Sequence, residues 1–250
     1  MKDKFLERFI RFCKYFISNN FEAHHKYQNK NQITNADLIL RLLKSKNFYP
    51  VNIVDVGCGY GEWTKKMNKY FPKSEFYLFD ANINNEIYLQ NLKGIIKNLY
   101  YRICLLSDTV DKYKFYNMGS GSSIFEENTS HQRTIETIKS STLYSELPKN
   151  ILNTKNNLIK LDVQGAELKI LNGLNDMLNS FEIVILEVSL HEYNKGAPLY
   201  LEVANFLDNN GFRLYDIFDL KRLGKKKSFL LQFDCVFVKK SSHLFNVDFN

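Results

Sequence analysis

Residues 54–61 read VDVGCGYG and stand between a short apolar run and a stretch with helical spacing. This pattern predicts a strand, a glycine-rich turn and the start of a helix. Gly57, Gly59 and Gly61 permit a tight turn and let the backbone approach a ligand where a Cβ would clash. Asp55 is placed toward a cationic or hydrogen-donating group. A turn that binds nothing is the less favoured interpretation, because three spaced glycines after an acid are costly without a ligand.

The spacing of these glycines separates two cofactors. A dinucleotide fingerprint needs a third glycine three positions after the second, and this chain has Glu62 there. A carboxylate at that position would repel a pyrophosphate. S-adenosylmethionine carries a cationic amino group and a sulfonium but no phosphate, so the pattern Asp-x-Gly-x-Gly-x-Gly favours it. We expect this loop, with Trp63 just beyond it, to bind S-adenosylmethionine.

The next two predicted strands supply further cofactor residues. Residues 75–80 read EFYLFD, and Asp80, followed by Ala81, is placed to accept the ribose hydroxyls of a nucleoside. An exposed acid at a strand end is the alternative. The following strand, predicted over 101–106, leads into Ser107 and Asp108, where an adenine edge could bind. These two residues could equally form a turn.

The chain predicts one doubly wound α/β domain. Its 250 residues, 44% of them apolar, can bury one core, and no linker divides them. After an N-terminal helical extension (residues 1–47), strand-like segments alternate with helical ones, which predicts a parallel sheet covered on both faces. The segments are 51–56, 75–80, 101–106, 158–162, 183–188 and 212–217.

The last strand and one intervening segment depart from this alternation. Residues 229–239 follow only a short loop, so they should pair antiparallel with the preceding strand. Six parallel strands and one reversed strand make the Rossmann-like, seven-stranded sheet of class I methyltransferases. Residues 112–150, with the sequence GSGSS at 119–123, break the alternation. We interpret them as an active-site insertion, with a surface loop as the alternative.

Polar residues follow strands four and five, where ligands of open α/β sheets bind. Asp162 ends the fourth strand, Gln164 lies in the turn after it, and Glu187 and His191 end or follow the fifth. Asp162, Glu187 and His191 could hold a divalent ion such as Mg, Mn or Fe. Without a metal, Asp162 or His191 could act as the general base, and Gln164 could contact the cofactor. In a purely structural role, Asp162 would cap a helix and Glu187 would pair with a basic residue.

At this point the chain resembles the FkbM family of S-adenosylmethionine-dependent methyltransferases. The matching segments are Val54 to Gly61, Phe79-Asp80, Leu106 to Asp108, Gly121 to Ser123, Leu158 to Leu171 (LIKLDVQGAELKIL), Ile185 to Val188, Gly211-Phe212 and Gln232 to Asp234. Two departures are Asp80-Ala81 in place of Glu-Pro, and Thr142-Leu143-Tyr144 in place of Thr-Leu-Asp. The resemblance implies O-methylation of a sugar or polyketide-type hydroxyl, in bacteria often within polysaccharide gene clusters.

The expected function is therefore methyl transfer to a sugar hydroxyl. The acceptor would be a nucleotide sugar or glycan in capsule or lipopolysaccharide biosynthesis. An RNA ribose or another small molecule is the alternative acceptor, and a cofactor-binding partner module of a glycan-assembly enzyme is the alternative without activity. A nucleic-acid partner is not expected, because all four prolines are isolated and neither a Pro-Pro-Tyr nor a Pro-Cys motif occurs.

Charge and cysteine usage bear on partners and location. The net charge is +7, and its densest cluster is Lys225 to Lys227 after Lys221 and Arg222, either a solvated turn or a site for a phosphate-bearing substrate. Residues 4–17 predict a basic amphipathic helix that packs on its own domain, touches a membrane or mediates a dimer. Charged residues near the N-terminus interrupt the apolar region that a signal peptide would need, and no apolar run is long enough to span a membrane. The four cysteines form no metal-type pair and suit a reducing compartment. We therefore expect a cytoplasmic protein.

Overall fold

The computed structural model describes residues 35–246. By its internal contacts the chain divides into Met1–Ile39 and Leu40–Asn250, and the fold reported below is that of the second unit. Helix α2 (Asn35–Ser45) spans the boundary between the two units. The helix predicted at 4–17 lies outside the described residues. Within the described part of the chain, no helix combines the length and apolar character needed to span a bilayer.

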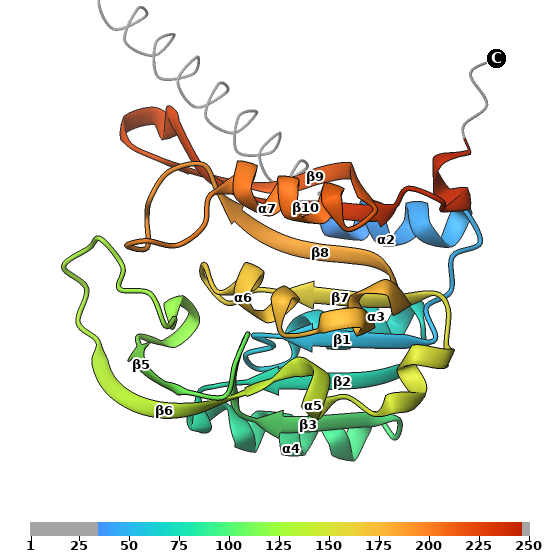
Figure 1. Cartoon of the computed structure of the whole chain (residues 1–250), viewed down its shortest axis with the longest axis horizontal. Coiled ribbons are helices and arrows are strands. Elements are labelled where there is room, and N and C mark those ends of the chain that lie inside the picture. Colours follow the sequence, from blue (N-terminus) through green and yellow to red (C-terminus); the bar gives the residue numbers. More distant parts are fainter. Residues whose placement is uncertain (1–34, 247–250) are drawn as a thin grey trace, which may run out of the picture. The chain divides into compact units, whose positions relative to one another are not determined.

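A seven-stranded sheet in the order β3-β2-β1-β7-β8-β10-β9 forms the centre of this unit (Figure 1). Neighbouring strands are parallel from β3 to β8, whereas β10 is antiparallel to both β8 and β9. The predicted sheet, with six strands in one direction and the last one reversed, is confirmed. The strands are β1 (Asn52–Val56), β2 (Glu75–Asp80), β3 (Leu99–Ile103), β7 (Asn157–Leu161), β8 (Phe181–Ser189), β9 (Phe212–Leu223) and β10 (Phe229–Lys239).

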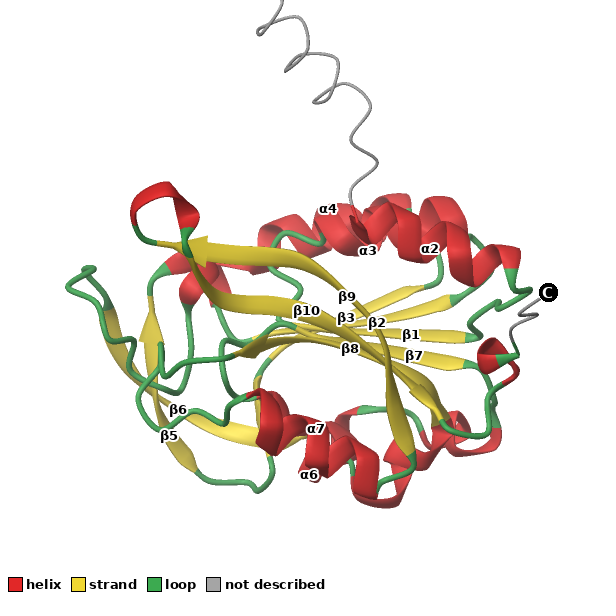
Figure 2. Cartoon of the chain, turned by 90° about the horizontal axis from the view of Figure 1, so that it is seen from above, coloured by secondary structure: helices red, strands yellow, loops and turns green. Residues whose placement is uncertain are grey.

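Helices cover both faces of the sheet, with α3 and α4 on one side and α6 and α7 on the other (Figure 2). The helices are α3 (Glu62–Tyr70), α4 (Glu86–Ile95), α5 (Leu143–Glu146), α6 (Glu167–Asn172) and α7 (Tyr200–Asn209). Short 3₁₀ helices occupy Ile83–Asn85, Gly119–Gly121, Lys149–Asn153, Asn175–Ser180, Lys225–Lys227 and His243–Phe245. This double cover explains why the central strands are nearly continuous apolar runs.

The two central strands bring the important loops together. Every residue of β1 and of β7 is buried, and Val56 pairs with Leu161 at the ends of the two strands. One step further, the amide of Asp162 donates to the carbonyl of Val56 over 2.9 Å. The glycine loop that follows β1 and the turn that follows β7 are therefore neighbours because the strands are parallel and adjacent.

The third strand is shorter than predicted, and the chain then joins a second sheet. The amide of Cys104 donates to the Asp80 carbonyl at 2.8 Å, and the chain turns away. Residues Leu105–Ser107 form β4, which pairs in parallel with β6 (Thr134–Thr142), and β5 (Lys112–Asn117) pairs with β6 in the antiparallel direction. The apolar run at 101–106 therefore serves two sheets, a division that its pattern does not reveal.

Candidate active site

The glycine loop has the backbone that its sequence predicts. Gly57, Gly59 and Gly61 have φ angles of 72°, 53° and 75°, all in the left-handed region. A Cβ on Gly57 would lie 1.9 Å from the carbonyl oxygen of Asp162, and one on Gly61 would lie 2.4 Å from Cδ2 of Leu92. No atom lies within 4 Å of a Cβ built on Gly59. The first and third glycines thus allow close packing, whereas the second borders open space.

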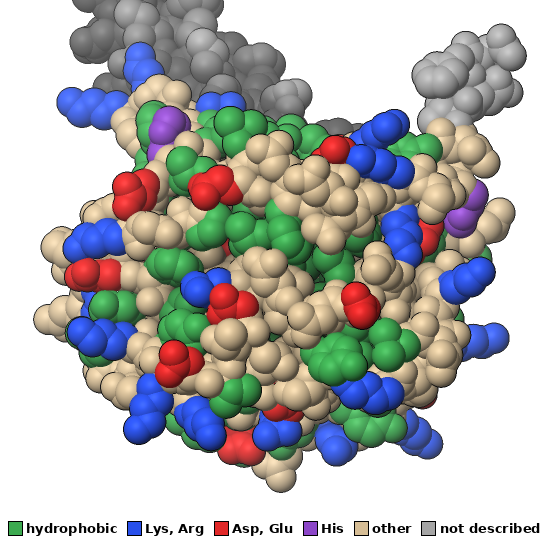
Figure 3. Space-filling view, in the orientation of Figure 1, with side chains coloured by type: hydrophobic (Ala, Val, Ile, Leu, Met, Phe, Trp, Pro, Cys, Tyr) green, Lys and Arg blue, Asp and Glu red, His purple; other side chains and the backbone are tan. Residues whose placement is uncertain are grey.

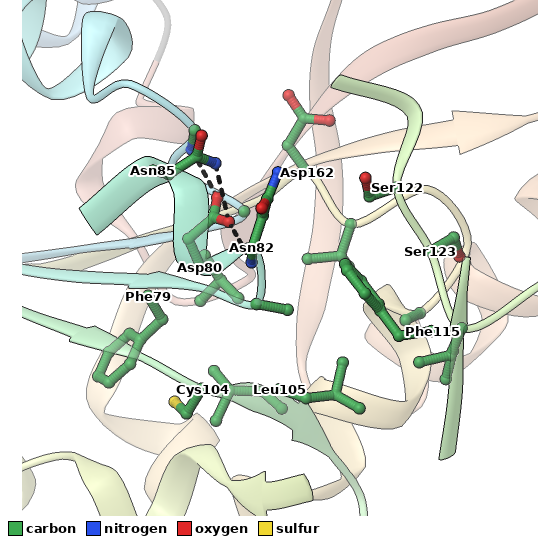
Figure 4. Close-up of a pocket in the computed structure, with 18 of the residues that line it drawn as sticks. Phe79, Asp80, Asn82, Asn85, Cys104, Leu105, Phe115, Ser122, Ser123 and Asp162 are labelled. Atoms are coloured by element: carbon green, nitrogen blue, oxygen red, sulfur yellow. Dashed lines mark hydrogen bonds between the residues drawn. The ribbon is translucent and has the colours of Figure 1, made fainter. Parts of the chain in front are cut away.

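Asp80 joins the end of β2 to this loop. Its Oδ2 accepts the amide of Gly59 at 2.8 Å, and its Oδ1 accepts the amide of Asn82 at 2.8 Å and Nδ2 of Asn85 at 3.0 Å (Figure 4). Burial raises the pKa of the Asp80 carboxyl, and these three hydrogen bonds oppose that rise. The carboxylate is held in one orientation at the wall of a pocket.

The pocket is a cavity of about 310 Å³ at the carboxyl ends of the central strands (Figure 4). Its volume is in the range of small-molecule sites. Its lining includes the end of β1 with the glycine loop, the end of β2 with the residues after it, the Cys104–Leu106 segment, and the turn after β7 with helix α6. Loop residues Gly119, Ser120, Ser122, Ser123 and Ile124, with Phe115 of β5, close one side.

Four predicted cofactor residues line this cavity, namely Gly57, Gly59, Asp80 and Ala81. The remaining ones, Asp55, Gly61, Trp63, Ser107, Asp108 and Gln164, lie outside its lining. Sequence reasoning missed Tyr60, Asn82 and Asn85, which do line it. Asn82 and Asn85 follow Asp80 closely in the sequence. This closeness to a strand-end acid could have marked them as pocket residues.

Asp55 contacts residues on the side of β1 that faces away from the pocket. The side chain of this fully buried residue accepts a hydrogen bond from Oγ1 of Thr64 at 2.6 Å, and Nζ of Lys160 lies 3.9 Å from its other oxygen. Side chains alternate along a strand, so Asp55 faces away from Val54 and Val56, and Val56 is the one that lines the pocket. Asp55 therefore ties helix α3 to β1. Trp63, on the same helix, has its ring 5.7 Å from the Lys160 ammonium.

Ser107 and Asp108 turn toward a different partner. Ser107 is fully buried and its hydroxyl donates to Asp108 at 2.9 Å, while Asp108 forms an ion pair with Lys169 at 3.3 Å. Burial acts to raise the pKa of Asp108, but Ser107 and Lys169 outweigh it and lower the pKa. The residues just before them, Cys104 to Leu106, line the pocket instead. The transfer of the chain from β3 to β4 accounts for this displacement.

Asp162 is the carboxylate that borders the pocket after β7. Its side chain is 39% exposed, and its oxygens accept Nζ of Lys160 at 3.1 Å and Nε2 of Gln164 at 3.1 Å. Burial acts to raise the pKa of this carboxyl, but the Lys160 ammonium outweighs it, so the pKa is lowered. Asp162 is therefore ionised at neutral pH and has one side open to a ligand.

Glu187 lies beside this group without lining the pocket. It is 5% exposed, forms an ion pair with Lys221, and accepts Nε2 of Gln164 at 3.0 Å. Burial raises its pKa against the effect of Lys221. Gln164 thus bridges Asp162 and Glu187 through one amide group, from a backbone with φ of 54°.

The predicted metal set of Asp162, Glu187 and His191 is not assembled. His191 is exposed, and its ring packs against Phe229 with 4.3 Å between ring centroids. Among residues 35–246, no three His, Cys, Asp or Glu side chains are arranged to hold a metal ion. Lys160 and Lys221 occupy the carboxylates, and two ammonium groups oppose the binding of a divalent cation at these oxygens. His191 was misplaced because it follows the end of a strand, where alternation no longer sets direction.

Three residues of this cluster were missed by sequence reasoning: Lys160, Lys221 and Asp234. Asp234 lies opposite Glu187 in the β10–β8 pairing, and burial together with the acids Glu187 and Asp162 raises its pKa to about 7. Lys160 offered a signal, since a lysine within the buried run LIKL requires a buried partner. Asp234 lies in the segment Gln232 to Asp234 that carries the family resemblance and Lys221 lies in the basic cluster, but only strand pairing places the two beside Glu187.

The FkbM methyltransferase domain profile matches residues 55–214, which include the glycine loop, the pocket and the Asp162 turn. The chain belongs to the FkbM methyltransferase family. It is an S-adenosylmethionine-dependent methyltransferase. No curated protein matches the chain in sequence.

Solved structures similar to this FkbM protein are distant. A precorrin-6y C5,15-methyltransferase from Geobacter metallireducens is 9% identical with a TM-score of 0.47, covering 84% of this chain and 92% of that one. A ribosomal protein L11 methylase from Lactobacillus delbrueckii is 12% identical with a TM-score of 0.47, covering 82% and 78%. A 1,6-didemethyltoxoflavin-N1-methyltransferase from Burkholderia thailandensis is 10% identical with a TM-score of 0.43, covering 92% and 90%. These similarities are too distant to bear on the acceptor.

The pocket of the FkbM domain fits the methionine-derived cofactor. The space beside Gly59 admits a ligand against the backbone, and the Asp80 carboxylate with Asn82 and Asn85 presents groups that suit ribose hydroxyls. Phe79, Leu105 and Leu106 offer an apolar surface for a flat base. When bound, S-adenosylmethionine supplies an electrophilic methyl group.

Replacing Asp80 should weaken cofactor binding selectively. We expect Asp80→Ala to lower the affinity for S-adenosylhomocysteine by at least about tenfold, because hydrogen bonds to a charged group contribute about 1.5–3 kcal/mol. Asp108→Ala is the matched control, since it removes a carboxylate that lies outside the pocket and should change affinity by less than about twofold. Calorimetric titration measures both. Equal losses in the two variants would contradict the placement of the ribose site at Asp80.

The buried Glu167 of the FkbM motif should make stability depend on pH. It accepts the amide of Val163 at 3.1 Å, and burial raises its pKa from 4.5 to about 7. A raised pKa in the folded state means that its stabilising contribution is complete below pH 4.5 and is lost as pH rises through about 7. Between these two pH values the free energy of unfolding of the wild type should fall by about 3 kcal/mol because of Glu167. The Glu167→Gln variant should not show this fall. Denaturant unfolding at a series of pH values measures it, with the exposed Glu136→Gln as control; parallel curves for Glu167→Gln and wild type would refute it.

Proposed function

We propose that this FkbM protein transfers a methyl group to a hydroxyl of a sugar. The acceptor is a sugar carried by a nucleotide or a glycan, as needed for building a bacterial surface polysaccharide such as capsule or lipopolysaccharide. The observation that carries the proposal is Asp162, an ionised and partly exposed carboxylate in the pocket wall. A carboxylate in that position can accept the proton of an alcohol.

The polar side of the pocket supports an acceptor with several hydroxyl groups. Ser120 and Ser122, from the loop at 119–123, line the same cavity as Asp162, and Figure 4 shows Ser122 near Asp162. Hydroxyl side chains both donate and accept hydrogen bonds, and they match a sugar better than an apolar ring. We therefore propose that residues 112–150 are an active-site insertion that helps to bind the acceptor.

The proposed chemistry assigns tasks to Asp162, Gln164 and Lys160. Asp162 accepts the hydroxyl proton, and Gln164 and Lys160 hold the carboxylate in place. Alignment of the hydroxyl with the methyl group supplies a large part of the rate, since well-oriented reactants have high effective concentrations. His191 has no part in this scheme, and because Lys160 and Lys221 occupy the acids, no step is assigned to a metal ion.

We propose that the reaction takes place in the cytoplasm. Of the cysteines in the described part of the chain, Cys58, Cys104 and Cys235 are free thiols, which suits a reducing compartment. Nucleotide-activated sugars provide the acceptor hydroxyl there. A peripheral membrane contact or a dimer through residues 4–17 remains a prediction.

The acceptor class can be tested directly. Wild-type protein is incubated with S-adenosylmethionine and separate pools of nucleotide sugars, simple glycosides and bacterial RNA, and products are analysed by mass. We expect one added methyl in the sugar pools, and at least about a hundredfold less product from Asp162→Asn in the same time. Methylated RNA together with unmodified sugars would overturn the proposal and favour a ribose acceptor.

A further inference from the structure

The hairpin that joins β9 and β10 carries an exposed cluster of positive charge. We define the basic hairpin as residues 219–229, all of which are exposed. It contains Arg222, Lys225, Lys226 and Lys227, and among the described residues none of these four forms an ion pair. Figure 3 shows lysine and arginine side chains gathered at this hairpin, at the upper left of the molecule. Unpaired cations in this number attract an anionic ligand.

The basic hairpin lies at the same edge of the sheet as the pocket. Strands β8 and β9 are both antiparallel to β10 and therefore parallel to each other, so the end of β9 is at the edge where β7 and β8 end. Figure 1 shows the β9–β10 turn at that edge. The hairpin is thus at the same edge of the sheet as the pocket, separated from β7 by β8 and β10.

Contacts from both strands join the basic hairpin to neighbouring elements, and those from β9 lead to the Asp162 carboxylate. On β9, Lys221 pairs with Glu187, which accepts the amide of Gln164, and Gln164 also donates to Asp162. On β10, Phe229 packs against His191, which follows β8. With a strand rise of about 3.3 Å per residue, Leu223 at the end of β9 lies about 7 Å beyond Lys221. The long side chains of Arg222 and Lys225 to Lys227 extend from there.

The backbone of the turn favours a functional role for these lysines. Lys226 and Lys227 have φ angles of 60° and 52°, in the left-handed region that suits glycine or asparagine. Each such residue costs about 1–2 kcal/mol. Unfavourable backbone conformations of this kind concentrate at functional sites.

We propose that the basic hairpin binds the pyrophosphate of a sugar-pyrophosphate acceptor while Asp162 receives the proton of its sugar hydroxyl. This inference rests on the proposed function and specifies its substrate class. Arginine and lysine form short, charge-assisted hydrogen bonds with phosphate oxygens. The acids Asp162, Glu187 and Asp234 would repel a phosphate. The pyrophosphate end of the acceptor therefore binds the cations of the hairpin, and the sugar end lies at the pocket beside Asp162. The pyrophosphate can belong to a nucleotide or to a lipid carrier.

Binding of inorganic pyrophosphate, which requires no methyl transfer, tests the site. The full chain saturated with S-adenosylhomocysteine is titrated calorimetrically as wild type and as the triple variant Lys225→Gln, Lys226→Gln, Lys227→Gln. We expect the triple variant to bind pyrophosphate at least about tenfold more weakly. The control is Lys73→Gln, Lys97→Gln, Lys155→Gln, which removes the same charge from exposed lysines just ahead of β2, β3 and β7, at the opposite edge. It should bind within about twofold of wild type.

The outcomes separate this inference from the function beneath it. Absence of pyrophosphate binding, or equal binding by wild type and hairpin variant, overturns the inference and leaves sugar methylation standing. Pyrophosphate binding that depends on the hairpin supports it even if no sugar is methylated, a result that would count against the proposed function alone. Binding of uridine diphosphate that is tighter than binding of inorganic pyrophosphate indicates a nucleotide carrier. Retention on phosphatidylcholine vesicles only when they contain a polyprenyl pyrophosphate indicates a lipid carrier.

Discussion

Asp162→Asn should lower the rate of methyl transfer by about 10²- to 10⁴-fold, the range that a general base contributes. The amide keeps the shape of the side chain and a hydrogen-bonding oxygen, but it cannot accept a proton from a hydroxyl. Because the carboxylate is only one of many groups around the pocket, affinity for S-adenosylhomocysteine should change little. Single-turnover kinetics with a methylated-product assay measures the first quantity, and calorimetry measures the second.

The control for this prediction is Asp208→Asn, which removes an exposed acid whose partner is Lys240 at 2.8 Å. It should leave turnover unchanged, since exposed ion pairs contribute little. If Asp162 only positions the turn after β7, Asp162→Asn will transfer methyl groups at nearly the wild-type rate. That result would remove Asp162 from the chemistry, although the pocket would remain.

Gly57→Ala should destabilise the fold and abolish cofactor binding. Its Cβ would lie 1.9 Å from the carbonyl oxygen of Asp162, at a backbone φ of 72°. Neither atom can move without separating the ends of β1 and β7. We expect a loss of about 3 kcal/mol or more in the free energy of unfolding, as for other substitutions that overpack a core. Urea unfolding and titration with S-adenosylhomocysteine measure the two effects.

Gly59→Ala provides the matched control for stability. Gly59 has the same left-handed backbone, but no atom lies within 4 Å of the added carbon. Its cost should be about 1–2 kcal/mol, the conformational penalty alone. Equal destabilisation by both substitutions would show that the contact with Asp162 contributes nothing to the cost.

Much of the fold was predictable because its central strands are buried on both faces. Burial on both faces requires a run of apolar residues, as in β1 and β7, and such runs are visible in any sequence. The turn after β1 was also predictable, since close backbone packing at Gly57 excludes every other residue. Asp80 ends β2 and Asp162 follows β7, and both were predictable at one edge of the sheet because the carboxyl ends of parallel strands meet there.

The prediction failed where a residue's direction depends on a partner distant in sequence. The apolar pattern predicts one strand over 101–106, but pairing of β4 with β6 divides it, and Asp108 pairs with Lys169. His191 was grouped with Asp162, but its ring packs on Phe229 of β10. Asp55 could have been placed correctly, because alternation along β1 puts it opposite the pocket-lining Val56.

The sequence by itself determined the doubly wound fold, the cofactor loop and the edge of the sheet that carries the chemistry, because local backbone demands and apolar runs leave direct marks on residue type. Only the tertiary structure decided which acids face the pocket and which cations hold them. Lys221 reaches Glu187 through the pairing of β9, β10 and β8, and Lys160 lies between Asp55 and Asp162 because β1 and β7 are neighbours. Such contacts follow from strand order, which no local pattern encodes.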